Sequence, residues 1–192
     1  MRVDASPGAP LVRKGHGELA GRCARLIRDV PDYPGLGVLF KDITPLLADG
    51  PVFAAVVGHL AEVARAAGGI ELVAGMEARG FIIGAPVATA LGIGFVPVRK
   101  AGKLPGPIMS ESYDLEYGSA TVEVHPDTIA PGSRVLVVDD VLATGGTAAA
   151  TVALIEQAGG VVVGLAFLIE LAFLSGRSRL AGRALDVILT VD

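Results

Sequence analysis

The spacing of apolar residues divides the chain into alternating helices and strands. Helical spacing runs over residues 17–30 and 53–67, and prolines or paired glycines follow each segment. Short apolar runs of strand length cover residues 72–75, 95–98, 135–138, 161–169 and 185–191, the last as an edge strand. Residues 119–124 alternate in polarity, as an antiparallel strand does. This order predicts an α/β fold with a doubly wound, mostly parallel sheet flanked by helices.

Two connections interrupt this pattern. Residues 38–45 are expected to form a compact apolar turn. Residues 100–114 are rich in Gly, Pro, Lys and Ser and show no periodicity. A connection of that length is commonly either disordered or functional.

The longest uncharged run, residues 80–98, is long enough to raise the question of a membrane span. Two prolines and two glycines interrupt it, so we interpret it as a helix to Leu91 followed by a strand. The first residues carry prolines and no long apolar core, so residues 1–14 are expected to be a flexible N-terminal extension and not a signal peptide. We therefore expect no membrane partner.

The junction after residues 135–138 carries the most distinctive chemistry. Two carboxylates, Asp139 and Asp140, follow the strand, and small or hydroxyl residues then open a helix. These are Ala143, Thr144, Gly145, Gly146 and Thr147. Small residues let backbone N–H groups converge, and a helix N-terminus favours an anion. The lysine of a P-loop is missing, and two acids suit a ligand that also offers hydroxyls, such as a ribose 5-phosphate. An ordinary strand-to-helix turn is the alternative.

Other polar segments fall at the ends of predicted strands. They are residues 77–80, 99–103 and 170–171, in addition to residues 139–147. Ligands of doubly wound sheets bind beyond the carboxyl ends of the strands. The sequence therefore predicts one site to which all four segments contribute.

Composition narrows the classes of function. Hydrophobic residues make up 52% and charged residues 19% of the chain, which is a globular composition. The net charge of -4 gives no electrostatic reason to expect nucleic-acid binding. A single cysteine, Cys23, excludes an internal disulfide and fits a reducing compartment. The three histidines show no metal-ligand spacing.

Five motifs point to a known family. Residues 135–147 resemble the signature of the type I phosphoribosyltransferases that binds 5-phosphoribosyl 1-pyrophosphate (PRPP). The segments Leu39-Phe-Lys-Asp-Ile, Glu77-Ala-Arg-Gly-Phe, Arg99-Lys-Ala-Gly-Lys-Leu-Pro and Tyr113-Asp-Leu-Glu-Tyr-Gly resemble the branch of that family that acts on adenine. The resemblance implies one domain over residues 15–192, with a small N-terminal hood near residues 15–50 and a flexible catalytic loop near residues 100–116.

The resemblance also assigns roles to residues that bind PRPP. Asp139 and Asp140 would accept hydrogen bonds from the ribose hydroxyls, and residues 143–147 would hold the 5-phosphate. The pyrophosphate would be bound by Arg79, Arg99, Lys100 and Lys103, with Mg²⁺ carried by PRPP and no protein metal ligand assigned. Similar enzymes can hold a non-proline cis peptide before this arginine, which here is Glu77–Ala78. A solvated basic loop is the alternative for the cations.

Adenine recognition and catalysis complete the implied site. Leu39, Phe40, Lys41 and Leu171 would bind adenine, with Phe40 and Leu171 on either side of the ring. Lys41 departs from the arginine common in similar enzymes, so we expect its main chain to make the contact. Glu116 would be the general acid/base, with Arg79 as a further catalytic residue. The products would be AMP and pyrophosphate, formed by a cytoplasmic homodimer. The alternatives are another base, such as xanthine, and a regulator that binds PRPP without catalysis.

Overall fold

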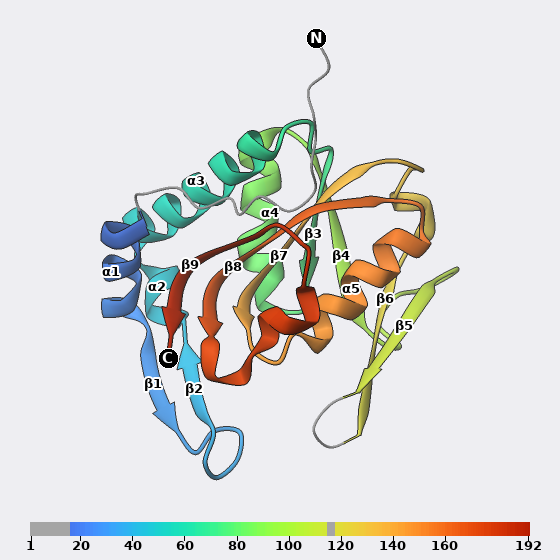
Figure 1. Ribbon diagram of the computed structural model, residues 1–192. Helices are drawn as coiled ribbons and strands as arrows, with labels where there is room; N and C mark the ends of the chain where they lie inside the picture. The colour runs from blue at the N-terminus through green and yellow to red at the C-terminus, as the bar shows by residue number, and fades with distance from the viewer. Residues whose placement is uncertain (1–15, 115–117) are drawn as a thin grey trace.

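A seven-stranded sheet forms the centre of the protein in a computed structural model that describes residues 16–114 and 118–192 (Figure 1). Its strands, in spatial order, are β5 (Met109–Asp114), β6 (Ser119–Val124), β4 (Gly94–Lys100), β3 (Leu72–Met76), β7 (Arg134–Leu142), β8 (Val161–Leu171) and β9 (Leu185–Val191). The strands β4, β3, β7, β8 and β9 run parallel to one another. At one edge β6 pairs antiparallel with β4, and β5 pairs antiparallel with β6. The predicted mostly parallel sheet is confirmed, with β9 as its other edge.

Helices cover both faces of this sheet, as a doubly wound fold requires (Figure 1). One face carries α1 (His16–Leu26), α2 (Thr44–Ala48), α3 (Gly50–Ala67) and α4 (Arg79–Leu91). The other face carries α5 (Gly146–Gln157). Three short 3₁₀ helices, η1 (Pro126–Thr128), η2 (Ala172–Leu174) and η3 (Gly176–Leu180), lie in connections.

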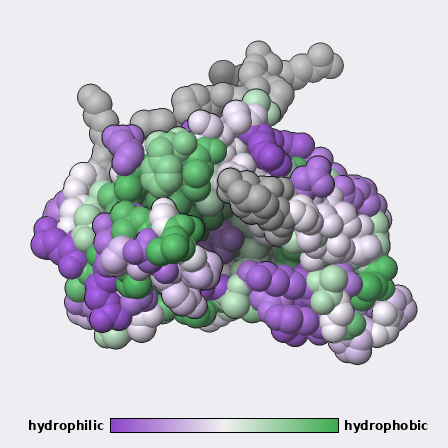
Figure 2. All heavy atoms as spheres, turned by 90° about the horizontal axis from the view of Figure 1, so that it is seen from below, coloured by the Kyte–Doolittle hydropathy of each residue, from purple (hydrophilic) through white to green (hydrophobic). Residues whose placement is uncertain are grey.

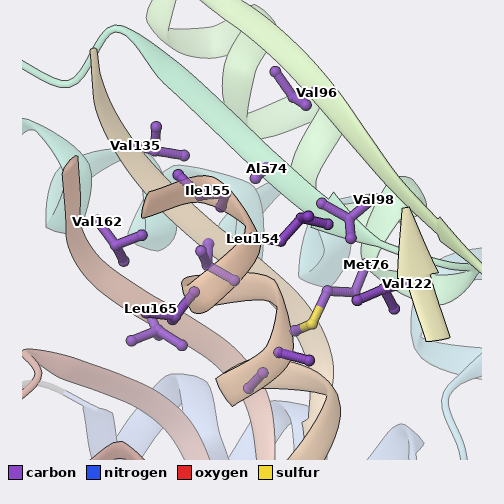
Figure 3. Close-up of a cluster of buried hydrophobic side chains, with 14 of the residues drawn as sticks. Ala74, Met76, Val96, Val98, Val122, Val135, Leu154, Ile155, Val162 and Leu165 are labelled. Atoms are coloured by element: carbon purple, nitrogen blue, oxygen red, sulfur yellow. The ribbon is translucent and has the colours of Figure 1, made fainter. Parts of the chain in front are cut away.

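The core is divided by the sheet into two clusters of buried side chains. Figure 3 shows the cluster under α5, where Leu154 and Ile155 pack with Val135, Val162 and Leu165 of the neighbouring strands. Because both faces of the central strands are buried, their sequences are continuously apolar and do not alternate.

The N-terminal region differs from the sequence prediction. The predicted helix to Val30 is too long, since α1 ends at Leu26 and β1 (Arg28–Pro31) follows. This strand pairs antiparallel with β2 (Leu39–Asp42), which lies where a compact turn was expected. Arg28 and Asp42 join the two strands through an ion pair of 2.6 Å. Pairing with β2 satisfies backbone groups of β1 that one further helical turn would otherwise have used.

Two other elements refine the prediction. Strand β5 lies inside the long connection in which no periodicity was found, and it pairs with β6 along its whole length. The uncharged run of residues 80–98 covers most of α4 and β4, which are separated at Gly92, a residue in the left-handed conformation. No helix in the described part of the chain is both long and apolar enough to cross a membrane.

The carboxyl ends of the parallel strands meet on one side of the molecule, beside the β1–β2 hairpin (Figure 1). Seen from this side, the surface is hollowed near its centre, and hydrophilic residues line part of the hollow (Figure 2). The predicted polar segments lie at the carboxyl ends of β3, β4, β7 and β8. Residues 77–80 follow β3, but the strands β4, β7 and β8 are longer than predicted, so that Asp139 and Asp140 lie inside β7 and do not follow it. The hollow is therefore the position of the candidate site.

Candidate active site

The two acids of the site lie near the end of β7. The backbone N–H of Asp140 donates to Oδ1 of Asp139 at 2.9 Å. Burial, and after it the neighbouring Asp140, raises the pKa of Asp139 well above its ordinary value. Burial also raises the pKa of Asp140, although Arg79 acts in the opposite direction. The pair therefore holds negative charge at a cost that cations or hydrogen-bond donors of a ligand would reduce.

Arg79, the first residue of α4, connects this acid pair to the β1–β2 hairpin. Its Nε lies 2.9 Å from Oδ2 of Asp140, as an ion pair without a hydrogen bond, because no N–H is directed at this oxygen. Its Nη1 donates to the carbonyl oxygen of Lys41 at 3.3 Å. The guanidinium carbon lies 4.9 Å from the centre of the Phe40 ring. One side chain thus contacts two of the segments predicted to bind different parts of the substrates.

The next residue, Gly80, explains how α4 begins so close to β7. A Cβ atom at this position would lie 2.8 Å from Oδ1 of Asp139 and 2.8 Å from the carbonyl oxygen of Val138. No real Cβ atom tolerates such distances, so only glycine allows this approach. The preceding Glu77–Ala78 peptide bond is cis, as the family resemblance implied.

The loop between β7 and α5 encloses a small cavity. Its volume is about 70 Å³, and it is lined by residues 143–147 together with Asp139, Met76 and Phe167. Gly145 has a φ of 79°, and a Cβ atom there would lie 2.5 Å from the carbonyl oxygen of Gly176. The N-terminus of α5 faces this loop and favours an anion. The geometry thus suits a single phosphate group.

Segment 176–180 supports this loop from outside. Glu170, which is 4% exposed at the end of β8, accepts a hydrogen bond of 2.6 Å from Nε of Arg177. No role was predicted for this pair from the sequence. A carboxylate inside a buried apolar strand was the available signal, because such a charge needs a partner.

Three of the four predicted pyrophosphate cations, Arg99, Lys100 and Lys103, lie around a second acid, Glu77, whose segment was predicted at the site without a role for this residue. The fourth, Arg79, pairs with Asp140 instead. Glu77 is paired through Oε1 with Nζ of Lys103, and its Oε2 accepts from the backbone N–H of Lys100 at 2.9 Å and from Nε of Arg99 at 3.4 Å. Burial alone would raise the pKa of Glu77, but these donors, Lys103 first, lower it to about 2. We call Glu77, Arg99, Lys100 and Lys103 the cation cluster. Arg99 and Lys103 therefore already have a counter-ion in this state, whereas Lys100 contacts Glu77 through its backbone N–H.

The predicted adenine residues lie in two places. Leu39, Phe40 and Lys41 belong to β2, whereas Leu171 ends β8 and is 9% exposed. The Phe40 ring packs edge-on against Tyr33, with 5.1 Å between their centres. The side chain of Lys41 turns away to Asp29 at 2.7 Å, on the other strand of the hairpin.

Main-chain groups of β2 point toward the hollow. The carbonyl oxygen of Lys41 accepts a hydrogen bond from Arg79, so it is not used for pairing with β1. In antiparallel strands the N–H and C=O of one residue point to the same side, and the direction repeats every second residue. The N–H of Lys41 and the main-chain groups of Leu39 therefore face away from β1 as well. Glu116, the predicted general acid/base, lies outside the described residues.

Comparison with known proteins agrees with this architecture. The family model of the phosphoribosyl transferase domain matches residues 46–188. The adenine phosphoribosyltransferase of Streptomyces coelicolor is 62% identical over 169 residues, which is 86% of this chain and 92% of that protein. The crystal structure of adenine phosphoribosyltransferase from Rhodothermus marinus superposes with a TM-score of 0.86 at 50% identity, covering 91% of this chain and 99% of that one.

A third relative contains ligands. The Saccharomyces cerevisiae adenine phosphoribosyltransferase, solved with adenine and an imino-altritol bisphosphate, has a TM-score of 0.84 and 40% identity, over 90% of this chain and 99% of that one. The fold, the acid pair and the phosphate-sized loop define a phosphoribosyltransferase. The chain belongs to this family, and within it to the adenine phosphoribosyltransferases.

Proposed function

We propose that the protein transfers the 5-phosphoribosyl group of PRPP to N9 of adenine, which forms AMP and releases pyrophosphate in purine salvage. The observation that carries this proposal is the arrangement at the end of β7. There the acid pair stands beside a phosphate-sized cavity at a helix N-terminus. A ribose 5-phosphate offers hydroxyl donors to the acids and an anion to the loop.

In this proposal the substrates occupy the hollow in three parts. Residues 143–147 bind the 5-phosphate, and Asp139 and Asp140 accept hydrogen bonds from the ribose hydroxyls. The cation cluster receives the pyrophosphate, where its positive groups meet the charge that grows as the bond to the anomeric carbon breaks. Arg79, held by Asp140 and the Lys41 carbonyl, lies between the acid pair and the base.

Adenine is read by the main chain of β2 in this proposal. The carbonyl of Leu39 accepts from the 6-amino group, and the N–H of Lys41 donates to N1. The outward direction of these main-chain groups and the use of the Lys41 side chain by Asp29 support this reading over a side-chain contact. Phe40 and Leu171 would cover the two sides of the ring. Glu116 would manage the proton at N7 as general acid/base.

Mg²⁺ belongs to the proposal as an ion brought by PRPP. Among residues 16–114 and 118–192, no group of three or more His, Cys, Asp or Glu side chains could hold a metal alone. The acid pair fits as a partial ligand set, because carboxylate and phosphate oxygens are the ligands that Mg²⁺ prefers. When bound, Mg²⁺ would neutralise charge on the pyrophosphate leaving group.

Turnover with labelled adenine, PRPP and Mg²⁺ tests the function, and AMP is the expected product. Hypoxanthine is the matched competitor, since it reverses the donor and acceptor that Leu39 and Lys41 would read. The wrong base leaves buried polar groups unpaired, and such discrimination reaches about 10⁴-fold. Binding of PRPP without turnover would favour a regulator, and equal kcat/KM for the two bases would refute the main-chain reading.

Assembly and location form a separate part of the proposal. As in the family, we propose a homodimer that acts in the cytoplasm, with residues 15–192 as one domain and residues 1–14 as an extension. Light scattering of the purified protein tests the dimer, which should persist at micromolar concentration. A monomer that turns over adenine at the full rate would contradict it.

A further inference from the structure

Tyr113 lies on β5, yet its hydroxyl reaches the proposed phosphate loop. Oγ1 of Thr147, in the first turn of α5, donates to Oη of Tyr113 at 2.9 Å. The Tyr113 ring lies against Gly146, where a Cβ atom would be 3.0 Å from Cδ2 of the ring. The proposed function uses Thr147 for the 5-phosphate but gives Tyr113 no role.

The contact is one of two side-chain hydrogen bonds that join β5 to α5. At the far end of the helix, Nε2 of Gln157 donates to Oε2 of Glu111 at 2.7 Å. Glu111 and Tyr113 share one face of β5, because alternate residues of a strand point the same way. The Tyr113 ring also packs against the buried cluster under α5. Packing of the ring and the Gln157–Glu111 hydrogen bond therefore both hold the Tyr113 hydroxyl in position.

The hydroxyl of Thr147 has one hydrogen and two lone pairs. In the ligand-free arrangement that hydrogen is directed to Tyr113, so it is not available to a phosphate oxygen. A phenol can reverse its role without moving any heavy atom. Tyr113 then donates to Oγ1, and Thr147 turns its own hydrogen to the anion. Hydrogen bonds in such a chain polarise one another, so the donation to the phosphate is strengthened.

We propose that Tyr113 is a positioning residue for 5-phosphate recognition, which orients the hydroxyl of Thr147 and strengthens its hydrogen bond to the ligand. This proposal rests on the proposed assignment of residues 143–147 to the 5-phosphate. It confines the effect of Tyr113 to ligands that carry this phosphate, namely PRPP, AMP and ribose 5-phosphate. Adenine and pyrophosphate carry none and should not depend on it.

Tyr113→Phe removes the hydroxyl and keeps the ring. One hydrogen bond of ordinary strength corresponds to about two- to tenfold in affinity. We expect ribose 5-phosphate affinity to fall and the PRPP KM to rise by this factor, with kcat nearly unchanged. Calorimetric affinities for adenine and pyrophosphate should equal those of the unchanged protein. In a Thr147→Val protein, Tyr113→Phe should cause no further loss of ribose 5-phosphate affinity. In a Thr147→Ser protein, which keeps the hydroxyl, Tyr113→Phe should again lower this affinity.

Ser112→Ala is the matched control. Ser112 precedes Tyr113 on the same strand, and its hydroxyl also bonds a threonine hydroxyl, that of Thr121 at 2.9 Å. It should leave ribose 5-phosphate affinity unchanged. If Tyr113→Phe also leaves this affinity unchanged, the proposal is wrong. If it weakens adenine and pyrophosphate equally, Tyr113 is only structural, and the proposal is wrong again.

A measurement on the unchanged chain covers the case in which Tyr113→Phe does not fold. The chain has three tyrosines, so ¹³Cζ-tyrosine labelling gives three signals, and Tyr33→Phe and Tyr117→Phe variants identify the Tyr113 signal by elimination. Ribose 5-phosphate should shift the Tyr113 signal as its hydroxyl changes from acceptor to donor, and pyrophosphate should not. A Tyr113 signal that ribose 5-phosphate leaves in place would overturn the proposal. Failure of the proposed function itself would be seen separately, as absent turnover of adenine and PRPP by the unchanged protein.

Discussion

Replacing Glu77 by Gln is expected to tighten pyrophosphate binding. Glu77 is the counter-ion of Lys103 and Arg99 in the ligand-free state, and its side chain is 9% exposed. Pyrophosphate that enters the cation cluster must therefore compete with a carboxylate for the same cations. Gln retains an oxygen for the backbone N–H of Lys100, so Glu77→Gln removes the charge with little change of shape.

The magnitude follows from the charges and their exposure. Two unit charges 4 Å apart interact by about 4 kcal/mol at an effective dielectric constant of 20. The Lys103 side chain is 47% exposed, so solvent screens much of the attraction between Lys103 and Glu77. About 1–2 kcal/mol remains, which corresponds to about tenfold in affinity. The gain should shrink with added salt, and kcat should fall if slower pyrophosphate release becomes limiting.

Calorimetry with pyrophosphate at two salt concentrations is the assay, with ribose 5-phosphate as the reference ligand. Glu71→Gln is the control. Glu71 lies directly before β3, at the end opposite to Glu77, and its side chain also accepts a hydrogen bond from a backbone N–H, that of Arg134 at 3.0 Å. It should leave both affinities unchanged. Weaker pyrophosphate binding by Glu77→Gln would mean that Glu77 organises the cations for the ligand, which would refute the competition argument.

Three further predictions concern other parts of the site. Asp139→Asn and Asp140→Asn should each raise the PRPP KM several-fold, because charge-assisted hydrogen bonds are roughly twice as strong as neutral ones; unchanged steady-state kinetics would contradict this. Glu116→Leu should lower the single-turnover rate about 10²–10⁴-fold with adenine affinity retained, and a near-normal rate would exclude the catalytic role. Gly145→Ala should destabilise the fold by about 1–3 kcal/mol in urea unfolding, because of its positive φ and the close carbonyl. Gly58→Ala, in open space on α3, should not destabilise it.

The strand, loop and helix of residues 134–157 could be predicted from the sequence because their signals are local. A β-branched run, two acids and a stretch of small residues identify β7, its loop and the start of α5 without reference to any distant residue. The convergence of four polar segments on one site then followed from the rule that ligands of such sheets bind beyond the carboxyl ends of the strands. The structure confirms that each of these segments lies at the carboxyl end of a strand.

The elements that the sequence missed depend on distant partners. Ile27 and Val30 continue the helical spacing of α1, but pairing with residues 39–42 makes this segment a strand. Strand β5 alternates half-buried and exposed positions, so it lacks the apolar run that identified the central strands. The role of Glu77 was missed for the same reason, because its cations lie 22 to 26 residues further along the chain.

The two acids of β7 should differ in one respect that only the structure reveals. Asp139 lines the phosphate cavity, whereas Asp140 is paired with Arg79, which in turn contacts the Lys41 carbonyl and the Phe40 ring. Asp140→Asn would therefore loosen Arg79 and, through it, the part of β2 that we propose to bind adenine. Adenine affinity measured by calorimetry should fall for Asp140→Asn and stay unchanged for Asp139→Asn. If both variants bind adenine as the unchanged protein does, Arg79 does not connect the ribose and base subsites, and the hairpin holds its main-chain groups without it.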